Sequence, residues 1–345
     1  MNKVRYPERY SLCNYDLSLE FFDELGIKVN DIVPLRKVFI ISTDEGDKIL
    51  KKVDYDTERI DLISESLDYI KNSYTNIISY NKFKDGLNYK IWKEDIYIVM
   101  DILDGREASF SNPLEINICA KNIALMHNAS RGLRDHLKNI YKKDFLDAPL
   151  TEKFKKMYEE LLLMKSLVKS YKYKNEFDKL FIGNVDKYLD EILKSQENLE
   201  KSKYEELRLN GETISLCHND LAYHNFLTKK QEVNIIDFDF MTLDLRIMDI
   251  WDFILKAIKN SAFDINKMIM AIDGYESVSI LKNEEKEILY ILLGFPRDFY
   301  ITARDYYYKR KAWDYEVYLN RFKNKLENEI FRYEFLELYK NKFKI

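Results

Sequence analysis

The sequence predicts an α+β fold in which a small, strand-rich lobe is followed by a larger, mainly helical lobe. Between about residue 29 and residue 53, apolar side chains recur with the period of two that is typical of strands. Beyond residue 106, most apolar positions recur at the three- and four-residue spacing of helices. The segment Asp101–Arg106, which contains Gly105, separates the two patterns and predicts a hinge. We therefore expect a small lobe over residues 1–102 and a large lobe over residues 103–345.

The small lobe is predicted to combine an antiparallel sheet with one crossing helix. A first helix is expected over residues 14–26, because apolar residues recur at helical spacing and Gly26 follows as a stop signal. The turn Asp44–Asp47 lies between two strand-like runs and predicts a hairpin. The remaining predicted elements of this lobe are strands 38–42, 48–53, 77–80 and 96–100 and helix 57–72.

The large lobe is predicted to be mostly helical. Asn112 followed by Pro113 is a typical helix start, with a capping side chain before a proline at the first helical position. Further helices are expected over residues 154–172, 184–199 and 263–345, and another is expected to open at Asp244–Asp252. Within that helix, Asp249 is expected either to accept hydrogen bonds from a neighbouring loop or simply to suit the helix dipole.

The stretch over residues 214–240 carries the side chains that indicate a chemistry. It is predicted to form a strand, a polar loop, a short strand, a turn and a last strand. Its candidate catalytic or metal-binding residues are His218, Asp220, Asn225, Asp237 and Asp239. Phosphoryl transfer requires a carboxylate that orients and deprotonates a hydroxyl, together with oxygen ligands for Mg²⁺. Asp220 suits the first role, whereas Asn225, Asp237 and Asp239 suit the second.

A plainer interpretation exists for each of these residues taken singly. Asp and Asn are common in turns, because their side chains bond to the nearby backbone. The combination favours the functional interpretation, because apolar strands flank the loop on both sides and the second of them ends in Asp-Phe-Asp.

The small lobe offers candidate contacts for a nucleotide. Lys51 and Lys52 point to opposite faces of a predicted strand, and Lys51 is preferred because it shares a face with apolar residues. Two solvated edge-strand lysines are the alternative. The helix over residues 57–72 is expected to supply an acidic partner, either Glu58 or Glu65. The backbone near Ile102, at the predicted hinge, is expected to receive the adenine edge.

Composition excludes several classes of function. The formal net charge is −4, from 55 basic and 59 acidic residues, so no excess of positive charge indicates nucleic acid or an anionic membrane as a partner. No apolar run approaches about 18 residues, and the first residues lack the apolar core of a signal peptide. The chain is therefore expected to be cytoplasmic on synthesis.

The loop His218–Asn225 and the strand Ile235–Asp239 resemble the aminoglycoside-phosphotransferase and choline-kinase branch of the protein-kinase-like fold. The flanking motifs are more narrowly similar to CotS-type spore coat proteins, and these motifs are Asp104–Glu107, Ala124–Gly132, Gly294–Phe299 and Asp305–Trp313. The resemblance implies a two-lobed kinase-like fold, a place in the spore coat, and ATP and Mg²⁺ as cofactors. It also implies that Asp220 is the base, that His218 holds the loop, and that Lys51 contacts the nucleotide phosphates with a helix acid such as Glu65 as its partner.

The same resemblance leaves two hypotheses open. One is a phosphotransferase that acts on the hydroxyl group of a small molecule. The other is an inactive kinase-fold scaffold that binds other spore coat proteins. Kinases of this branch usually carry glycine in the first loop, whereas Ile32–Val38 has none, although Arg36 or Lys37 could supply charge there. The glycine-free loop favours the scaffold, and the presence of Asp220, Asn225 and Asp237 favours the enzyme.

Overall fold

The computed structural model describes residues 15, 17–36 and 38–345. The chain forms two compact units, each assembled from separate stretches. The first unit runs through Ala108 and also contains Gly132–Asp144 and Tyr223–Met241. The second unit contains Ser109–Arg131, Phe145–Ala222 and Thr242–Ile345. The predicted boundary at residue 102 lies close to the end of the first stretch, but two later segments also belong to the first unit.

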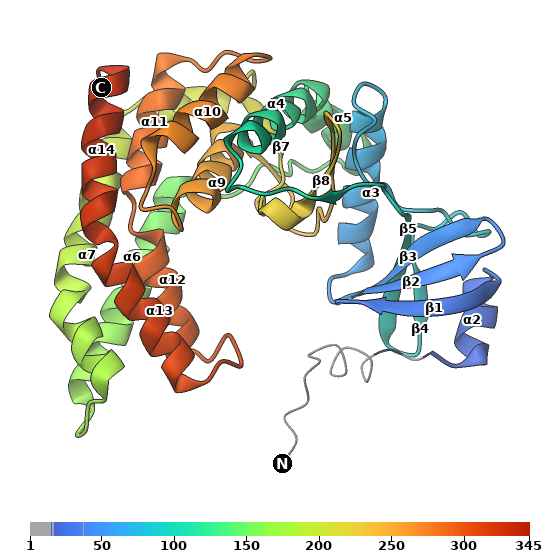
Figure 1. The fold of residues 1–345 in the computed structure, drawn as a ribbon, viewed down its shortest axis with the longest axis horizontal. Helices are drawn as coiled ribbons and strands as arrows, with labels where there is room; N and C mark the ends of the chain where they lie inside the picture. Colours follow the sequence, from blue (N-terminus) through green and yellow to red (C-terminus); the bar gives the residue numbers. More distant parts are fainter. Residues whose placement is uncertain (1–14, 16, 37) are drawn as a thin grey trace. The chain divides into compact units, whose positions relative to one another are not determined.

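The first unit is built on a five-stranded antiparallel sheet with the strand order β1-β2-β3-β5-β4 (Figure 1). Its strands are β1 Val29–Leu35, β2 Val38–Thr43, β3 Gly46–Val53, β4 Lys90–Trp92 and β5 Asp95–Asp101. The helix α2 Leu19–Leu25 begins at the capping side chain of Ser18 and ends at Gly26, which adopts φ 66°. Phe21 of α2 packs with Phe39 and Tyr97 of the sheet in a buried core, so the amphipathic helix covers one face.

Further elements of the first unit lie beyond this sheet. They are helices α3 Thr57–Lys71 and α5 Leu133–Tyr141, the 3₁₀ helix η1 Tyr223–Asn225, and strands β6 Arg106–Glu107, β8 Phe226–Lys229 and β9 Glu232–Ile235. Asp56 caps α3 by accepting a hydrogen bond from the backbone N–H of Arg59 at 2.8 Å. The strands β6, β8 and β9 pair antiparallel in that order.

The second unit is mainly helical and carries one two-stranded sheet. Its elements are α4 Pro113–Ala129, α6 Leu150–Ser170, α7 Glu176–Lys201, α8 Tyr204–Asn210, β7 Ile214–Cys217, β10 Thr242–Leu245, α9 Ile247–Ile258, α10 Ile265–Glu276, α11 Asn283–Gly294, α12 Arg297–Tyr307, α13 Tyr315–Glu327 and α14 Glu329–Phe343. The long helices α6 and α7 pack against each other, and α4 packs against α10 (Figure 1). Of the helices in the described part of the chain, none has the length and apolar character needed to cross a membrane.

The sheet and most helices agree with the expectations from sequence, but three details differ. Residues 77–80 do not form a strand, because only the isolated bridges Ile77 to Ile235 and Tyr80 to Met100 occur there. The first helix starts at Leu19, later than predicted, although residues 14 and 16 lie outside the described residues. Asp244 lies in β10 rather than in a helix, and α9 begins after it.

Candidate functional site

The first unit joins Lys51 of β3 to two of the predicted metal ligands. The Nζ atom of Lys51 lies 2.7 Å from Oδ1 of Asp237 and 2.7 Å from Oδ2 of Asp239. Burial alone would lower the pKa of Lys51, but the carboxylates of Asp239 and Asp237 offset this, and the pKa is raised. The lysine therefore stays charged at neutral pH.

This ion triad indicates a position suited to cations. Two carboxylates converge on one ammonium group, so their oxygens are already arranged around a positive charge. Hard oxygen ligands of this kind are those that Mg²⁺ prefers. The donor set therefore fits a divalent cation.

Asp239 is fixed by the surrounding side chains. Its Oδ1 accepts a hydrogen bond from the hydroxyl of Tyr55 at 3.1 Å, and the Tyr55 and Tyr80 hydroxyls lie 3.2 Å apart. Arg59 of α3 donates to the backbone oxygen of Asp239 at 3.0 Å. Burial raises the pKa of Tyr80 to about 12, so this hydroxyl keeps its proton at neutral pH. Asp239 is therefore held on both sides, by a lysine and by a tyrosine.

The hairpin of β8 and β9 positions the other two candidate ligands. Asn225 precedes β8, and its backbone oxygen accepts a hydrogen bond from the N–H of Ile236 at 3.0 Å. Asp237 follows Ile236 and adopts the left-handed φ of 69°, a conformation that Asp tolerates better than most residues. The backbone thus brings the segment of Asn225 beside that of Asp237. The predicted last strand ends at Ile235, so both aspartates lie after it.

The pairing expected for the helix over residues 57–72 is not found. Glu65 contacts Nε2 of His136 at 2.7 Å, whereas Glu58 contacts Lys143 at 3.1 Å. Lys51 is bonded to Asp237 and Asp239 instead, because these two residues reach its ammonium group from the segment that follows β9. Glu65 is therefore not the partner of Lys51 in this structure.

The other predicted nucleotide contacts are dispersed. Lys52, on the opposite face of β3, pairs with Asp95 of β5 at 2.7 Å. Ile102 follows β5 directly, and its residue surface is 39% exposed. Arg36 adopts φ 54° and contacts Glu107 at 2.5 Å, whereas Lys37 lies outside the described residues.

The second unit contains the loop of His218 and Asp220, and Asp249 of α9 organises it. The fully buried carboxylate of Asp249 accepts hydrogen bonds from the backbone N–H of His218 at 2.7 Å and of Asn219 at 2.8 Å. Nε2 of His127 lies 3.1 Å from the same carboxylate. The expectation that Asp249 accepts hydrogen bonds from this loop is confirmed. Nδ1 of His218 accepts a hydrogen bond from the backbone N–H of Asp220 at 3.2 Å, so the side chain of His218 helps to fix the loop.

Asp220 is held by a lysine that sequence reasoning did not identify. Nζ of Lys256 lies 2.6 Å from Oδ1 of Asp220 and 2.7 Å from Oδ2 of Asp252. The same Oδ2 of Asp252 accepts a hydrogen bond from the backbone N–H of Leu221 at 2.9 Å. Its Oδ1 accepts a hydrogen bond from the side chain of Arg297 at 3.1 Å. The carboxylate of Asp220 is therefore oriented by an ammonium group that is itself anchored on α9.

A buried cluster of His127, Cys217 and Asp249 has atoms close enough to bind a metal, all within 4.8 Å of one another. The cluster is better explained as a hydrogen-bond network. The oxygens of Asp249 already accept the hydrogen bonds of the loop, and Nδ1 of His127 lies 2.9 Å from the hydroxyl of Tyr275. Burial raises the pKa of the Cys217 thiol, which disfavours the thiolate that a metal would need.

One signal could have revealed two of the missed residues. Asp249, Asp252 and Lys256 follow one another at intervals of three and four, so they share one face of α9. Sequence spacing alone therefore places Asp252 and Lys256 beside the residue that was expected to support the loop. Tyr55 and Tyr80 gave no such signal, because only the tertiary fold brings them to Asp239.

A family model for choline/ethanolamine kinases matches residues 107–284, just over half of the 345 residues. The chain belongs to the choline/ethanolamine kinase family. The match covers the loop of Asp220 and the segment of Asp237 and Asp239, whereas Lys51 lies before it. The chain is also similar to Spore coat protein S of Bacillus subtilis (strain 168), with 25% identity in an alignment that covers 88% of this chain and 88% of that protein. The predicted resemblance to both groups is confirmed.

Solved structures agree on the fold of this choline/ethanolamine kinase family member. An aminoglycoside phosphotransferase from Alicyclobacillus acidocaldarius superposes with a TM-score of 0.78 and 16% identity, covering 99% of this chain and 98% of that one. An amicoumacin kinase in complex with AMP-PNP and Ca²⁺ gives a TM-score of 0.59 and 14% identity, covering 95% and 96% of the two chains. The predicted kinase-like α+β fold is confirmed.

Proposed function

We propose that this chain is an ATP- and Mg²⁺-dependent phosphotransferase that acts on a hydroxyl group of a small molecule, and that it serves in the spore coat. The observation that carries the chemistry is the triad in which Lys51 holds both Asp237 and Asp239 at 2.7 Å. Membership of the choline/ethanolamine kinase family and the similar kinase bound to AMP-PNP and Ca²⁺ support the cofactors. The similarity to Spore coat protein S supports the location.

In this proposal, different residues bind the metal, contact the phosphates and activate the acceptor. Bound ATP would supply the phosphoryl group, and Mg²⁺ would neutralise charge on its phosphates. Asn225, Asp237 and Asp239 would hold the metal, and Lys51 would contact phosphate oxygens. Asp220 would orient the acceptor hydroxyl and accept its proton, while Lys256 keeps the carboxylate in place.

A second function is favoured by a different observation. In the hairpin of β1 and β2, Leu35 pairs with Val38, so only two residues connect the strands and neither is glycine. Arg36 contacts Glu107 rather than remaining available for a phosphate. A chain without a glycine-rich loop over the phosphates would suit a scaffold that binds other spore coat proteins and catalyses nothing.

Nucleotide binding provides the first test. Thermal denaturation of the full chain with ATP and Mg²⁺ should show stabilisation of about 2.7 kcal/mol when the nucleotide is at 100 times its Kd. Lys51→Met should abolish this stabilisation, whereas Lys52→Met, on the opposite face of the same strand, should retain it. Asp237→Asn should remove the Mg²⁺-dependent part. Equal losses in both lysine variants would argue against the assignment of Lys51.

Turnover provides the second test. ADP release would be measured over a panel of hydroxylated metabolites that includes aminoglycosides, choline, homoserine and sugars. For a true acceptor, Asp220→Ala should lower turnover by about 10²- to 10⁴-fold with little change in ATP affinity. Background release across the panel, in a chain that also fails to bind ATP with Mg²⁺, would support the scaffold instead.

A further inference from the structure

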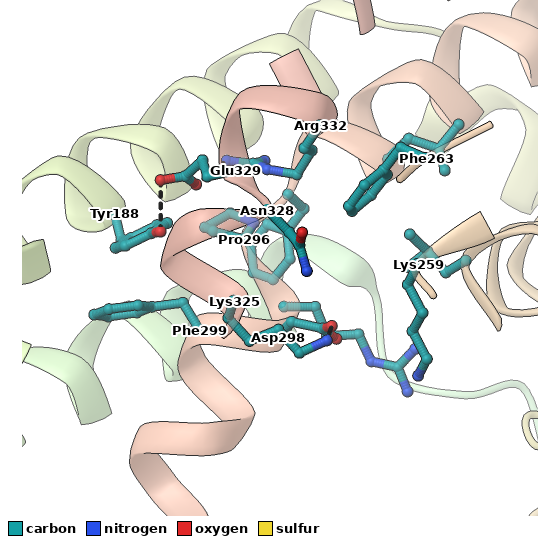
Figure 2. A pocket seen from close by; sticks show the side chains of 14 residues that line it. Tyr188, Lys259, Phe263, Pro296, Asp298, Phe299, Lys325, Asn328, Glu329 and Arg332 are labelled. Atoms are coloured by element: carbon teal, nitrogen blue, oxygen red, sulfur yellow. Dashed lines mark hydrogen bonds and ion pairs between the residues drawn. The ribbon is translucent and has the colours of Figure 1, made fainter. Parts of the chain in front are cut away.

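The second unit contains a hollow that the proposed chemistry does not use. It lies where α9, α11, α12, α13 and α14 approach one another, and Tyr188 of α7 contributes to its wall (Figure 2). The lining combines aromatic and apolar side chains with ionic ones. Its ionic residues are Lys259, Arg297, Lys325, Arg332, Asp298 and Glu329, so four cations face two anions.

The two acidic residues of this hollow are already paired. Asp298 forms an ion pair with Lys325. Glu329 accepts from the hydroxyl of Tyr188 at 2.6 Å and from Arg332 at 2.8 Å, and it also contacts Lys187. Both carboxylates are therefore occupied. Arg297 pairs with Asp252 at 3.1 Å and Arg332 pairs with Glu191 at 2.6 Å, so Lys259 is the ionic residue of the lining that forms no ion pair among the described residues.

Lys259 is the cation of this lining that no carboxylate contacts directly. Among the described residues, its Nζ atom has no hydrogen bond or ion pair, although the side chain is only partly exposed. Burial lowers the pKa of Lys259. The carboxylate of Asp298 raises this pKa, whereas the nearby cations Lys325 and Arg297 lower it further. Asp298 is shared with Lys325, so a further anion beside Lys259 would reduce the cost of burying its ammonium group.

A second polar group lies in the same hollow. Asn328, between α13 and α14, lines it with a side-chain amide that has no hydrogen bond among the described residues. Figure 2 shows Lys259 and Asn328 reaching into this region from different helices. An amide N–H and an ammonium group together are suitable donors for the oxygens of a carboxylate or a phosphate.

Part of the lining of the hollow is apolar and aromatic. Leu293, Phe295 and Pro296 contribute a buried wall, and Phe263 contributes an aromatic side chain. Phe263 and the preceding Ala262 adopt left-handed φ angles of 54° and 48°, which are unfavourable for a bulky residue. Backbone strain of this kind persists where the surroundings require it and is concentrated at ligand sites.

We propose that this hollow binds a small organic anion, whose carboxylate or phosphate group meets Lys259 and Asn328 while its apolar body contacts Phe263 and Phe295. The inference goes beyond the proposed function, because it involves no nucleotide and applies equally to an enzyme or a scaffold. Charge and shape both carry it: an unpaired cation supplies the attraction, and the aromatic lining supplies contact area.

Calorimetric titration of the full chain without nucleotide tests this site. The probes are benzoate and phenyl phosphate, with benzyl alcohol and benzylamine as uncharged and cationic counterparts. At least one anionic probe should bind at sub-millimolar concentration, at least about tenfold more tightly than either counterpart. Lys259→Met should weaken that binding by about 10- to 100-fold, the value of a charge-assisted hydrogen bond.

Two further variants make the test decisive. Asn328→Asp should weaken binding as well, because it adds a negative charge at the same place without shortening the side chain. Lys340→Met, which removes an exposed lysine from α14, should leave binding unchanged. The proposal would be overturned if neither anion binds below millimolar concentration, if Lys259→Met has no effect, or if benzylamine binds as well as the anions.

Discussion

Asp252 and Lys256 lie one turn apart on α9, share an ion pair of 2.7 Å, and together hold the segment Asp220–Leu221. Lys256 contacts the carboxylate of Asp220, and Asp252 accepts the N–H of Leu221. Both side chains of the pair are mostly buried. The pair is therefore expected to behave as one unit rather than as two independent contacts.

A double-mutant cycle measures this coupling. Asp252→Asn and Lys256→Met should each lower the free energy of unfolding, and their combined effect should depart from additivity by about 0.5–3 kcal/mol. The matched control is Glu197 with Lys201, an exposed pair of the same spacing on α7 at 3.9 Å. That pair should couple by less than about 0.5 kcal/mol. Equal coupling in both pairs, as urea denaturation would measure it, would contradict the buried-unit interpretation.

Sequence patterns were sufficient for the parts of this site that follow local rules. The spacing of His218, Asp220 and Asn225 identified the loop, and alternation along β3 selected Lys51 over Lys52. The partner of Lys51 was not predictable in this way. The sequence pattern is equally compatible with Glu65 of the helix and with Asp237, which is distant in sequence. Only the tertiary fold decides which of the two contacts Lys51.

Short elements were predicted less well for a related reason. Residues 77–80 have strand-like composition, yet their backbone pairs with Ile235 and Met100 only through isolated bridges, which no sequence period encodes. Similarly, β10 is only four residues long and pairs with β7, so its pattern could not be separated from the start of α9. Long helices such as α3 were predicted closely because capping and periodicity agree there.

The second prediction concerns Asp249. Asp249→Ala should lower the free energy of unfolding by about 3 kcal/mol or more, because it leaves the buried N–H groups of His218 and Asn219 and the ring of His127 without an acceptor. Asp190→Ala, an exposed position on α7, should change it by no more than about 0.5 kcal/mol. Urea denaturation of both variants provides the measurement. A small effect at Asp249 would show that the loop is held by packing alone.

The third prediction concerns Gly105, which connects β5 to β6. Gly105 adopts φ 143°, and a Cβ atom there would lie 3.0 Å from the backbone carbon of Leu227 in β8. Gly105→Ala should therefore destabilise the chain by about 1–3 kcal/mol, through backbone strain and displacement of β8. Gly183→Ala is the control, since this helical glycine of α7 has open space around it and should gain about 0.5–1 kcal/mol. Melting temperatures that shift in the same direction would refute the argument.

The last prediction concerns the pH dependence of stability at Lys259. Its pKa is lowered in the folded chain, so between that value and the unfolded pKa of about 10.4 the unfolded state binds more protons. Stability contributed by this residue must then rise with pH across that window and level off above it. Lys51 has the opposite shift, and its contribution is lost only as the pH rises through its raised pKa.

The comparison of wild type with Lys259→Met isolates this effect. At neutral pH the variant should be at least as stable as wild type, because it removes a partly buried ammonium group for which burial and the nearby cations outweigh the attraction of Asp298. As the pH approaches 10, the free energy of unfolding of wild type should rise relative to that of the variant, because Lys259 loses its proton and a neutral amine is less costly to bury. Urea denaturation at a series of pH values, with Lys340→Met as the reference for removing a lysine charge, gives the measurement. A wild-type advantage that is greatest at neutral pH would mean that Lys259 already has a stabilising partner, and the case for an anion site in the hollow would then fail.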